Sequence, residues 1–358
     1  MTTALHTVHD LRVALEALDA RPLHVRRLIA SWLDGRGGEE IPRRRGRTPR
    51  RPAKLEAGLG GLLADLDHLV TEVHVARDEE GSCRRLLRLR SGRTIESVDL
   101  PGDALCVSTQ VGCAVGCQFC RTGEDGLLQQ LGPLEILAQL AHARRTRTVR
   151  RVVLMGMGEP AHNLDAVLDA ISTMGDEGGL PHKSIVFSTV GDPDDFEVLG
   201  AQRVRPSLAL SLHTLDAERR SDLLPRARSV EPLDLLDAAI AYADRVHEPL
   251  LVQWTLLAGI NDSVEEAAQI GRALHGRRAI VNYIPFNEVE GSGFGRPPVE
   301  RCVELVRTVR AAGALATLRF SAGQEVDGGC GQLRARLAEQ LPDPLRGGAQ
   351  VFDDEVGA

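Results

Sequence analysis

The stretch CVSTQVGCAVGCQFCRTG, residues 106–123, contains four of the chain's seven cysteines. It begins within a short apolar run, ALCVS, the first of a series of such runs that alternate with amphipathic helical segments. The later runs are RVVLMG, SIVFST, SLALSL, LLVQWTLL, AIVNYIPF and ALATLRF. Repeated β-then-α units predict parallel strands joined by crossover helices, in either an open doubly wound sheet or a barrel.

Polar motifs at the strand ends favour the barrel. The cysteine stretch and four other motifs each begin where a predicted strand ends: GMGEP (156–160), STVG (188–191), SLH (211–213) and PFNEVEG (285–291). A β/α barrel builds its site from the loops at the carboxyl ends of its strands. The sequence therefore predicts an α/β fold, a barrel or part of one, with its site on one face.

The segments that flank the predicted barrel follow other patterns. Helical periodicity occurs at residues 9–19, 22–34 and 54–67, and short strands are predicted at 70–77, 84–90 and 94–99. We expect four parts: a helical N-terminal domain with a basic loop (1–78), a short β connector (79–103), the barrel (104–340) and a flexible acidic tail (341–358).

The composition is that of a globular protein. The 358 residues are 43% hydrophobic, which is enough to fill a sizeable core. The chain has neither the apolar segment of a signal peptide nor a run of eighteen apolar residues. We therefore expect a cytoplasmic protein with no membrane partner. In that reducing compartment, an odd number of closely spaced cysteines favours metal binding or thiol chemistry over a disulfide framework.

Positive charge is concentrated near the N-terminus. Residues 1–54 carry 12 Lys and Arg against 6 Asp and Glu, whereas the remainder carries 31 against 44. Most of this charge lies in RRRGRTPRRPAK, residues 43–54, which could contact a polyanion such as RNA. Such runs are more often solvated loops, and 3% aromatic residues leave few platforms for base stacking. Composition alone therefore favours the solvated loop.

Three of the cysteines form the spacing C-x3-C-x2-C: Cys113, Cys117 and Cys120. Three thiolates on one loop can bind three irons of a [4Fe-4S] cluster and leave the fourth iron open to a ligand. The alternatives are a zinc site, which would need Cys106 as its fourth ligand, and a purely structural cysteine cluster. The spacing favours the iron-sulfur cluster.

With Phe119 at its aromatic position, this motif resembles the signature of the radical S-adenosylmethionine (radical SAM) superfamily. The motifs LCVSTQVGC, GMGEP, the ST and SLH loops, IPFNEVEG and CGQL (330–333) further resemble the RlmN/Cfr family of RNA adenine methyltransferases. The resemblance extends from about Ile95 to Leu333. It implies a radical SAM partial (β/α)6 barrel with a small, mostly helical N-terminal domain, and a methyltransferase activity.

The resemblance also implies the binding residues. Cys113, Cys117 and Cys120 would hold the [4Fe-4S] cluster, whose open iron binds S-adenosylmethionine. Seven further positions match those that contact this cofactor in the family: Gly158, Glu159, Ser188, Ser211, Leu212, His213 and Asn287. Taken singly, each serine or asparagine is more typical of a loop cap.

Two further cysteines and a glutamate match the family's reacting residues. C2 and C8 of adenine are electrophilic carbons that do not attack a sulfonium methyl group directly. In the family, the residue matched by Cys330 accepts a methyl group from one cofactor molecule and then loses a hydrogen atom to the 5′-deoxyadenosyl radical of a second. The residue matched by Cys106 releases the product by forming a disulfide with Cys330. Glu96 matches the proton acceptor, although a strand glutamate is more often simply solvated.

The resemblance implies methylation of adenine C2 in 23S rRNA, with tRNA as a further target. C8 methylation is the close alternative, because RFSAGQEVDGG (319–329) and LPRARS (224–229) depart from the family pattern. A radical SAM enzyme that acts on a small molecule or peptide is another alternative, and a noncatalytic iron-sulfur or zinc RNA-binding protein is a third. We also expect an electron donor such as flavodoxin or ferredoxin, a monomer, and inert thiols at Cys83 and Cys302, with Cys302 buried.

Overall fold

The computed structural model describes residues 5–36, 51–79, 81–288, 291–323 and 327–334. The expected acidic tail, 341–358, lies outside the described residues, as does most of the expected basic loop. The loop's last two residues, Ala53 and Lys54, instead begin a helix. In the part of the chain described here, no helix is long and apolar enough to cross a membrane.

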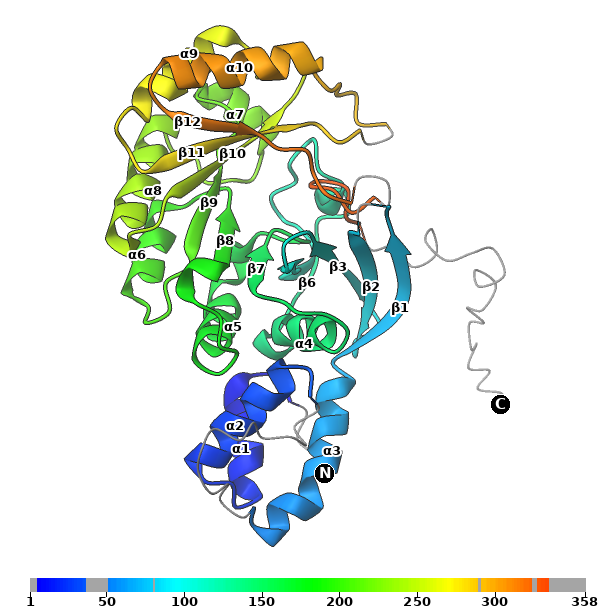
Figure 1. Ribbon diagram of the computed structural model, residues 1–358. Coiled ribbons are helices and arrows are strands. Elements are labelled where there is room, and N and C mark those ends of the chain that lie inside the picture. The colour runs from blue at the N-terminus through cyan, green and yellow to red at the C-terminus, as the bar shows by residue number, and fades with distance from the viewer. Residues whose placement is uncertain (1–4, 37–50, 80, 289–290, 324–326, 335–358) are drawn as a thin grey trace, which may run out of the picture.

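Three helices form the N-terminal part of the molecule, as the sequence predicts (Figure 1). They are α1 (Val8–Ala17), α2 (Pro22–Leu33) and α3 (Ala53–Asp67). Thr7 begins α1 with a capping box that it forms with Asp10, and Pro22 supplies the fixed φ that suits the first turn of α2. Their buried leucines pack together and against the helices of the main sheet.

A three-stranded antiparallel unit leads from these helices into the main sheet. It consists of β1 (Val70–Arg77), β2 (Cys83–Leu89) and β3 (Thr94–Leu100), and β3 pairs in turn with β4 (Ala104–Cys106). The predicted strands are confirmed to within one residue at each end. This unit forms one end of a ten-stranded sheet.

Six β/α units follow from β4, and they confirm the predicted partial (β/α)6 barrel (Figure 1). The strands after β4 are β7 (Arg151–Leu154), β8 (Ile185–Thr189), β9 (Ser207–Ser211), β10 (Leu250–Leu256) and β11 (Ala279–Pro285), and β12 (Leu315–Leu318) adds a last parallel strand. The crossover helices are α4 (Pro133–Arg144), α5 (Leu164–Asp176), α6 (Pro193–Ala201), α8 (Pro232–Val246), α9 (Val264–Ala273) and α10 (Val299–Ala311). Among the described residues, β12 pairs only with β11, so the barrel stays open.

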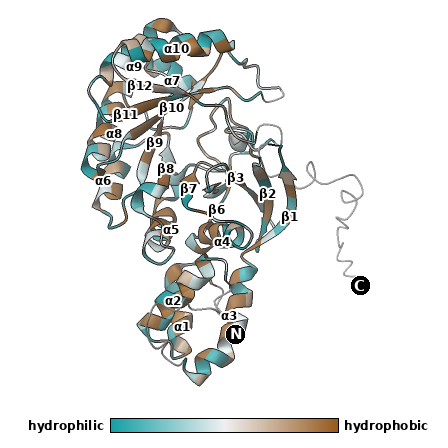
Figure 2. Ribbon diagram, in the orientation of Figure 1, coloured by the Kyte–Doolittle hydropathy of each residue, from teal (hydrophilic) through white to brown (hydrophobic). Residues whose placement is uncertain are grey.

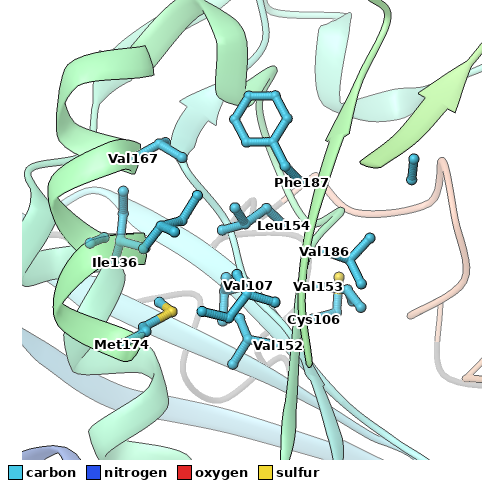
Figure 3. Packing of buried hydrophobic residues seen from close by; sticks show 14 of the residues in the cluster. Cys106, Val107, Ile136, Val152, Val153, Leu154, Val167, Met174, Val186 and Phe187 are labelled. Carbon is cyan, nitrogen blue, oxygen red and sulfur yellow. The ribbon is translucent and has the colours of Figure 1, made fainter. Parts of the chain in front are cut away.

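The core lies between the parallel strands and these helices. Figure 2 shows hydrophobic residues along β10 and β11 and mixed residues on the covering helices, because both faces of a parallel sheet are buried. Figure 3 shows Val152 and Phe187 of the sheet packed toward Ile136 of α4 and Val167 of α5. This packing fixes the strands whose carboxyl ends carry the polar motifs.

Several short elements were not predicted. β5 (Gln110–Gly112) and β6 (Leu127–Gln130) form a separate antiparallel pair, and α6 and α7 (Ala217–Leu223) lie in segments with no assigned helix. Three or four residues are too few to reveal a period of two. The sequence of α7, AERRSDL, buries only Arg220 and Leu223, so it has no apolar stripe.

Candidate active site

A cavity opens at the carboxyl ends of the parallel strands. Its wall contains residues from every motif that ends a predicted strand, with Phe286 representing PFNEVEG, and it also contains Cys330. The predicted site residues in it are Cys113, Cys117, Cys120, Gly158, Glu159, Ser188, Ser211, His213 and Cys330. The described residues therefore place eight of the predicted binding positions and one of the predicted reacting cysteines around a common space. Leu212, Asn287, Cys106 and Glu96 lie outside this wall.

The three cysteines of the C-x3-C-x2-C motif lie on a loop that is closed at its base. The strands β5 and β6 pair on either side of it, and the Cys113 N–H donates to the Gly126 carbonyl over 3.0 Å. At its far side the Gln118 N–H donates to the Leu223 carbonyl over 3.1 Å. The Phe119 ring packs edge-on against His213, with 4.9 Å between ring centroids. The aromatic position of the motif thus anchors the loop to the SLH strand end.

Burial raises the pKa of all three thiols. It raises the pKa of Cys113 to about 12 and that of Cys117 well above its usual value, and neighbouring thiols add to the rise at Cys117. At Cys120 burial also raises the pKa, while hydrogen bonds from Thr122 and Gly123 oppose the rise. Thiols whose pKa values are raised in this way become thiolates readily only when a metal takes the place of their protons.

The GMGEP loop is held by a glutamine that the sequence analysis did not single out. Gln110 Oε1 accepts the Glu159 N–H over 2.8 Å, and Gly158 next to it has φ +103°. A Cβ on Gly158 would lie 2.6 Å from the Gln110 Cβ, so only glycine fits without displacement. This contact fixes the position of Glu159.

Glu159 is a buried carboxyl group with both oxygens engaged. Its Oε2 accepts the Val190 N–H over 3.0 Å, and its Oε1 accepts the Ala161 N–H over 3.1 Å. Burial raises the pKa of Glu159 to about 7, and hydrogen bonds from Thr189 and these two amides oppose the rise. The group can therefore change protonation near neutral pH, which suits the binding of an ammonium group.

We predict that Gly158→Ala destabilises the fold by about 1–3 kcal/mol more than Gly92→Ala does. Gly92→Ala is the control. Gly92 also has a positive φ, of +81°, but a Cβ there meets no atom within 4 Å. The difference in unfolding free energy between the two variants therefore reports the clash with Gln110 and not the cost of the backbone conformation. Urea denaturation of the two variants and the wild type measures the free energy of unfolding. Equal losses of unfolding free energy in the two variants would show that Gln110 does not exclude a side chain at position 158.

His213 is held in one tautomer. The Thr255 N–H donates to His213 Nδ1 over 3.0 Å, so the ring proton of the neutral imidazole is on Nε2. Burial lowers the pKa of His213 to about 3, and the nearby Arg220 lowers it further. His213 is thus a neutral hydrogen-bond donor in the cavity wall, and its φ of +64° turns the chain where β9 ends.

A second, smaller cavity joins Cys330 to Cys106. Both cysteines line it, together with Gln253 and Arg319. Cys106 is the last residue of β4, and Figure 3 shows it with Val186 on the opposite side of the sheet from the helices. Burial raises the pKa of Cys106 to about 12, Cys330 adds to the rise, and Arg319 opposes it. Cys330 is exposed and borders both cavities.

Strand register places Glu96 on the same sheet face as Cys106. Val98 pairs with Cys106 across β3 and β4, and Glu96 is two residues from Val98, so the three side chains share a face. Glu96 is fully buried, with Oε1 accepting from Arg84 Nη1 over 2.6 Å and Oε2 accepting the Arg334 N–H over 2.9 Å. The expectation that a strand glutamate is simply solvated is wrong for Glu96, because the segment around Cys330 covers β3.

Comparisons with known proteins agree with this arrangement. Residues 107–270 match the radical SAM superfamily. Probable RNA methyltransferases of Pseudomonas aeruginosa and Bordetella avium are 52% and 51% identical to the chain, over 92% and 91% of its length and 95% and 92% of theirs. A crystal structure of a radical SAM methyltransferase from Sphaerobacter thermophilus superposes with a TM-score of 0.78 at 31% identity, covering 93% of this chain and 98% of that one.

The chain belongs to the RlmN/Cfr family of radical SAM RNA methyltransferases. Membership implies a [4Fe-4S] cluster and S-adenosylmethionine. The cysteine loop fits such a cluster, because Cys113, Cys117 and Cys120 supply three thiol ligands and leave a fourth iron open to another ligand. Three cysteines around one cavity leave room for a larger group.

Two buried polar atoms in this RlmN/Cfr family member lack a protein partner among the described residues, and one of them belongs to Gln253, which borders both cavities. Asn287 Oδ1 and Gln253 Nε2 are buried and have no hydrogen-bond partner in the part of the chain that the structure describes. The Asn287 amide nitrogen instead donates to the Cys330 carbonyl over 2.8 Å and to Ser321. Leu212 packs its side chain in the core, and its N–H donates to the Gln253 carbonyl over 3.1 Å.

Sequence reasoning missed three residues of this radical SAM site. Gln253 borders both cavities, and its signal was a polar residue inside the apolar run LLVQWTLL. Arg220 is a buried cation whose pKa burial lowers to about 10, while Cys117 and Glu159 oppose that change. Neither Arg220 nor Gln110 could be recognised from a sequence pattern, because each lies in a segment without clear periodicity.

Proposed function

We propose that this enzyme methylates adenine C2 of RNA, in 23S rRNA and also in tRNA, through a methylated Cys330. The single observation that carries the proposal is the position of Cys330. It borders both the cavity of the three motif cysteines and the cavity of Cys106. A thiol in that position can react first with a cofactor in one cavity and later with a second thiol in the other.

We assign the binding roles as follows. Cys113, Cys117 and Cys120 hold the cluster, which when bound supplies the electron that cleaves S-adenosylmethionine to methionine and a 5′-deoxyadenosyl radical. The cofactor contacts are Gly158, Glu159, Ser188, Ser211, Leu212, His213 and Asn287. The carboxyl group of Glu159 suits the cofactor's ammonium group, and the neutral Nε2–H of His213 donates to an acceptor.

The reacting residues then act in order. Cys330 loses its proton and takes a methyl group from S-adenosylmethionine, which leaves as S-adenosylhomocysteine. The methyl group next loses one hydrogen atom to the 5′-deoxyadenosyl radical, which becomes 5′-deoxyadenosine, and its carbon bonds to the ring carbon. Glu96 accepts the proton from that ring carbon, and the unpaired electron left on the ring would return to the cluster that supplied it. Cys106 loses its proton and attacks the Cys330 sulfur, which breaks the bond between that sulfur and the methylene carbon, and the carbon gains a proton to become the product methyl group. The product is free, and Cys106 and Cys330 remain as a disulfide.

The sequence-based predictions for partners complete the proposal. The N-terminal part, residues 1–78 with its basic loop, is the proposed RNA contact, because residues 1–54 carry 12 Lys and Arg against 6 Asp and Glu while the rest of the chain is acidic. A flavodoxin- or ferredoxin-type electron donor, a monomeric state and a cytoplasmic location stay predictions. The division into parts at residues 78, 103 and 340 also stays a proposal.

We predict that purified protein carries a methyl group on Cys330. Peptide mass spectrometry can read this directly, because the tryptic peptide FSAGQEVDGGCGQLR contains Cys330 as its only cysteine. An unmodified Cys330, even after anaerobic reconstitution with S-adenosylmethionine, would contradict the methyl relay. It would instead support a radical SAM reaction on a small molecule or peptide.

Nucleoside analysis of RNA then distinguishes the ring carbons. We expect 2-methyladenosine in RNA incubated with the reconstituted enzyme, and none with Cys330→Ala. 8-Methyladenosine would redirect the proposal to C8 chemistry, which uses the same residues.

A further inference from the structure

The segment that carries Cys330 lies directly on the cysteine loop. The Arg121 N–H donates to the Gly331 carbonyl over 2.8 Å, and the Thr122 hydroxyl donates to the Leu333 carbonyl over 2.7 Å. Arg121 and Thr122 immediately follow Cys120, the last cysteine of the motif. Two consecutive residues of the loop thus hold the backbone on the C-terminal side of Cys330.

Packing brings the two segments into close contact. Gly331 has φ +85°, and a Cβ there would lie 3.2 Å from the Phe119 carbonyl oxygen and 3.9 Å from the Cys120 Cα. Figure 1 shows the chain after β12 returning toward the ends of β2 and β3. The backbone of the cysteine loop therefore positions Cys330, and the missing side chain of Gly331 lets the two backbones approach each other.

Arg334 forms a second attachment. Its Nη1 pairs with Glu124 Oε2 over 2.7 Å, and its side chain is 17% exposed. Glu124 belongs to the same loop, four residues after Cys120. The Arg334 N–H also donates to Glu96, so the end of the segment is tied to β3 as well.

We propose that Thr122 is a positioning residue that fastens the methyl-accepting segment, residues 328–334, to the cluster-binding loop. Its hydroxyl is buried, with the residue 6% exposed, and it has one hydrogen to donate. Valine has nearly the same shape but no hydroxyl, so Thr122→Val would leave the Leu333 carbonyl buried without that donor. The segment would then sample positions in which Cys330 is displaced from the cofactor cavity. This inference rests on the proposed function, in which Cys330 carries the methyl group.

Hydrogen exchange of the anaerobically reconstituted enzyme tests the attachment. In the wild type the amides of Gly329, Gln332 and Arg334 are hydrogen-bonded. We expect peptides covering residues 328–334 to exchange about 2- to 10-fold faster in Thr122→Val, the factor that corresponds to one lost hydrogen bond. Thr122→Ser should restore the wild-type rate.

Thr173→Val is the matched control. Thr173 is a buried threonine of α5 whose hydroxyl donates to the Asp169 carbonyl over 2.8 Å, away from the site. The Thr173→Val substitution should leave the hydrogen exchange of residues 328–334 unchanged. Thr122 also forms a side-chain hydrogen bond with Cys120, so activity is compared at equal iron content. On that basis the 5′-deoxyadenosine formed per methyl group transferred to RNA should rise about 2- to 10-fold in Thr122→Val.

Wild-type exchange in Thr122→Val, or no rescue by Thr122→Ser, would overturn the proposal. If Thr122→Val loses iron, Arg334→Met decides the question, because it removes the second attachment and leaves the cysteine loop intact. Faster exchange of the same peptides supports the fastening, and unchanged exchange refutes it. An unmethylated Cys330 in the wild type would refute the proposed function, yet the exchange measurements would still report on the attachment.

Discussion

Cys117→Ala should leave a folded protein that binds little iron and forms no 5′-deoxyadenosine above background. Cys117 lines the cavity with Cys113 and Cys120, and each of the three thiolates would bind one iron of the cluster. Removing one ligand leaves an iron without its protein anchor, so the cluster is lost or unstable. The expected effect on cofactor cleavage is complete, because the described loop carries no cysteine besides Cys113 and Cys120 that could replace the lost ligand.

The measurement is iron and sulfide content, visible absorbance, and 5′-deoxyadenosine formed after anaerobic reconstitution. Cys302→Ala is the matched control, since Cys302 is 1% exposed within α10 and lies outside both cavities. Its burial confirms the expectation for that thiol, and its iron content should be that of the wild type. A Cys117→Ala protein with normal iron content and absorbance would refute the cluster assignment.

Cys106→Ala should trap RNA on the protein. Cys106 shares a cavity with Cys330, and alanine removes only the sulfur from a buried position. Methyl transfer to Cys330 and bond formation with the ring carbon do not use Cys106, so both should proceed. Without the second thiol the bond between Cys330 and the base cannot be broken by disulfide formation. The product should therefore accumulate as a covalent protein–RNA adduct.

Denaturing electrophoresis before and after nuclease digestion detects the adduct, and peptide mass spectrometry locates the nucleotide on Cys330. Cys83→Ala provides the control. Cys83 is a buried strand cysteine, 1% exposed, whose partner across β2 and β3 is Asp99 and which therefore faces away from Glu96 and Cys106. Free methylated RNA formed by Cys106→Ala at the wild-type rate would remove Cys106 from the mechanism.

The sequence predicted the barrel because apolar runs and polar strand ends alternate along it. Motifs at the carboxyl ends of parallel strands must lie on one face, so the sequence alone predicts that SLH and GMGEP lie close together. The positions of Leu212 and Asn287 could not be predicted in this way. Sequence does not reveal that one packs in the core and that the other donates to the Cys330 carbonyl.

Residues that support the site were harder to predict for a physical reason. Gln110 and Thr122 act through hydrogen bonds to backbone atoms that are distant in sequence, and such contacts leave no periodic pattern. The burial of Glu96 likewise depends on the segment after β12, which crosses β3 only in the folded chain. Sequence therefore located the reacting groups better than it located the groups that hold them.

The attachment between Thr122 and Leu333 joins residues that are 211 positions apart. Contacts of such separation carry a large loop-closure cost and form late in folding. During synthesis the cysteine loop leaves the ribosome long before its partner segment exists. A nascent chain can therefore acquire its cluster ligands while still lacking the methyl-accepting thiol. We expect the cluster ligands and the methyl-accepting thiol to reach their places at different times, with the complete site forming only after residue 334 has been made.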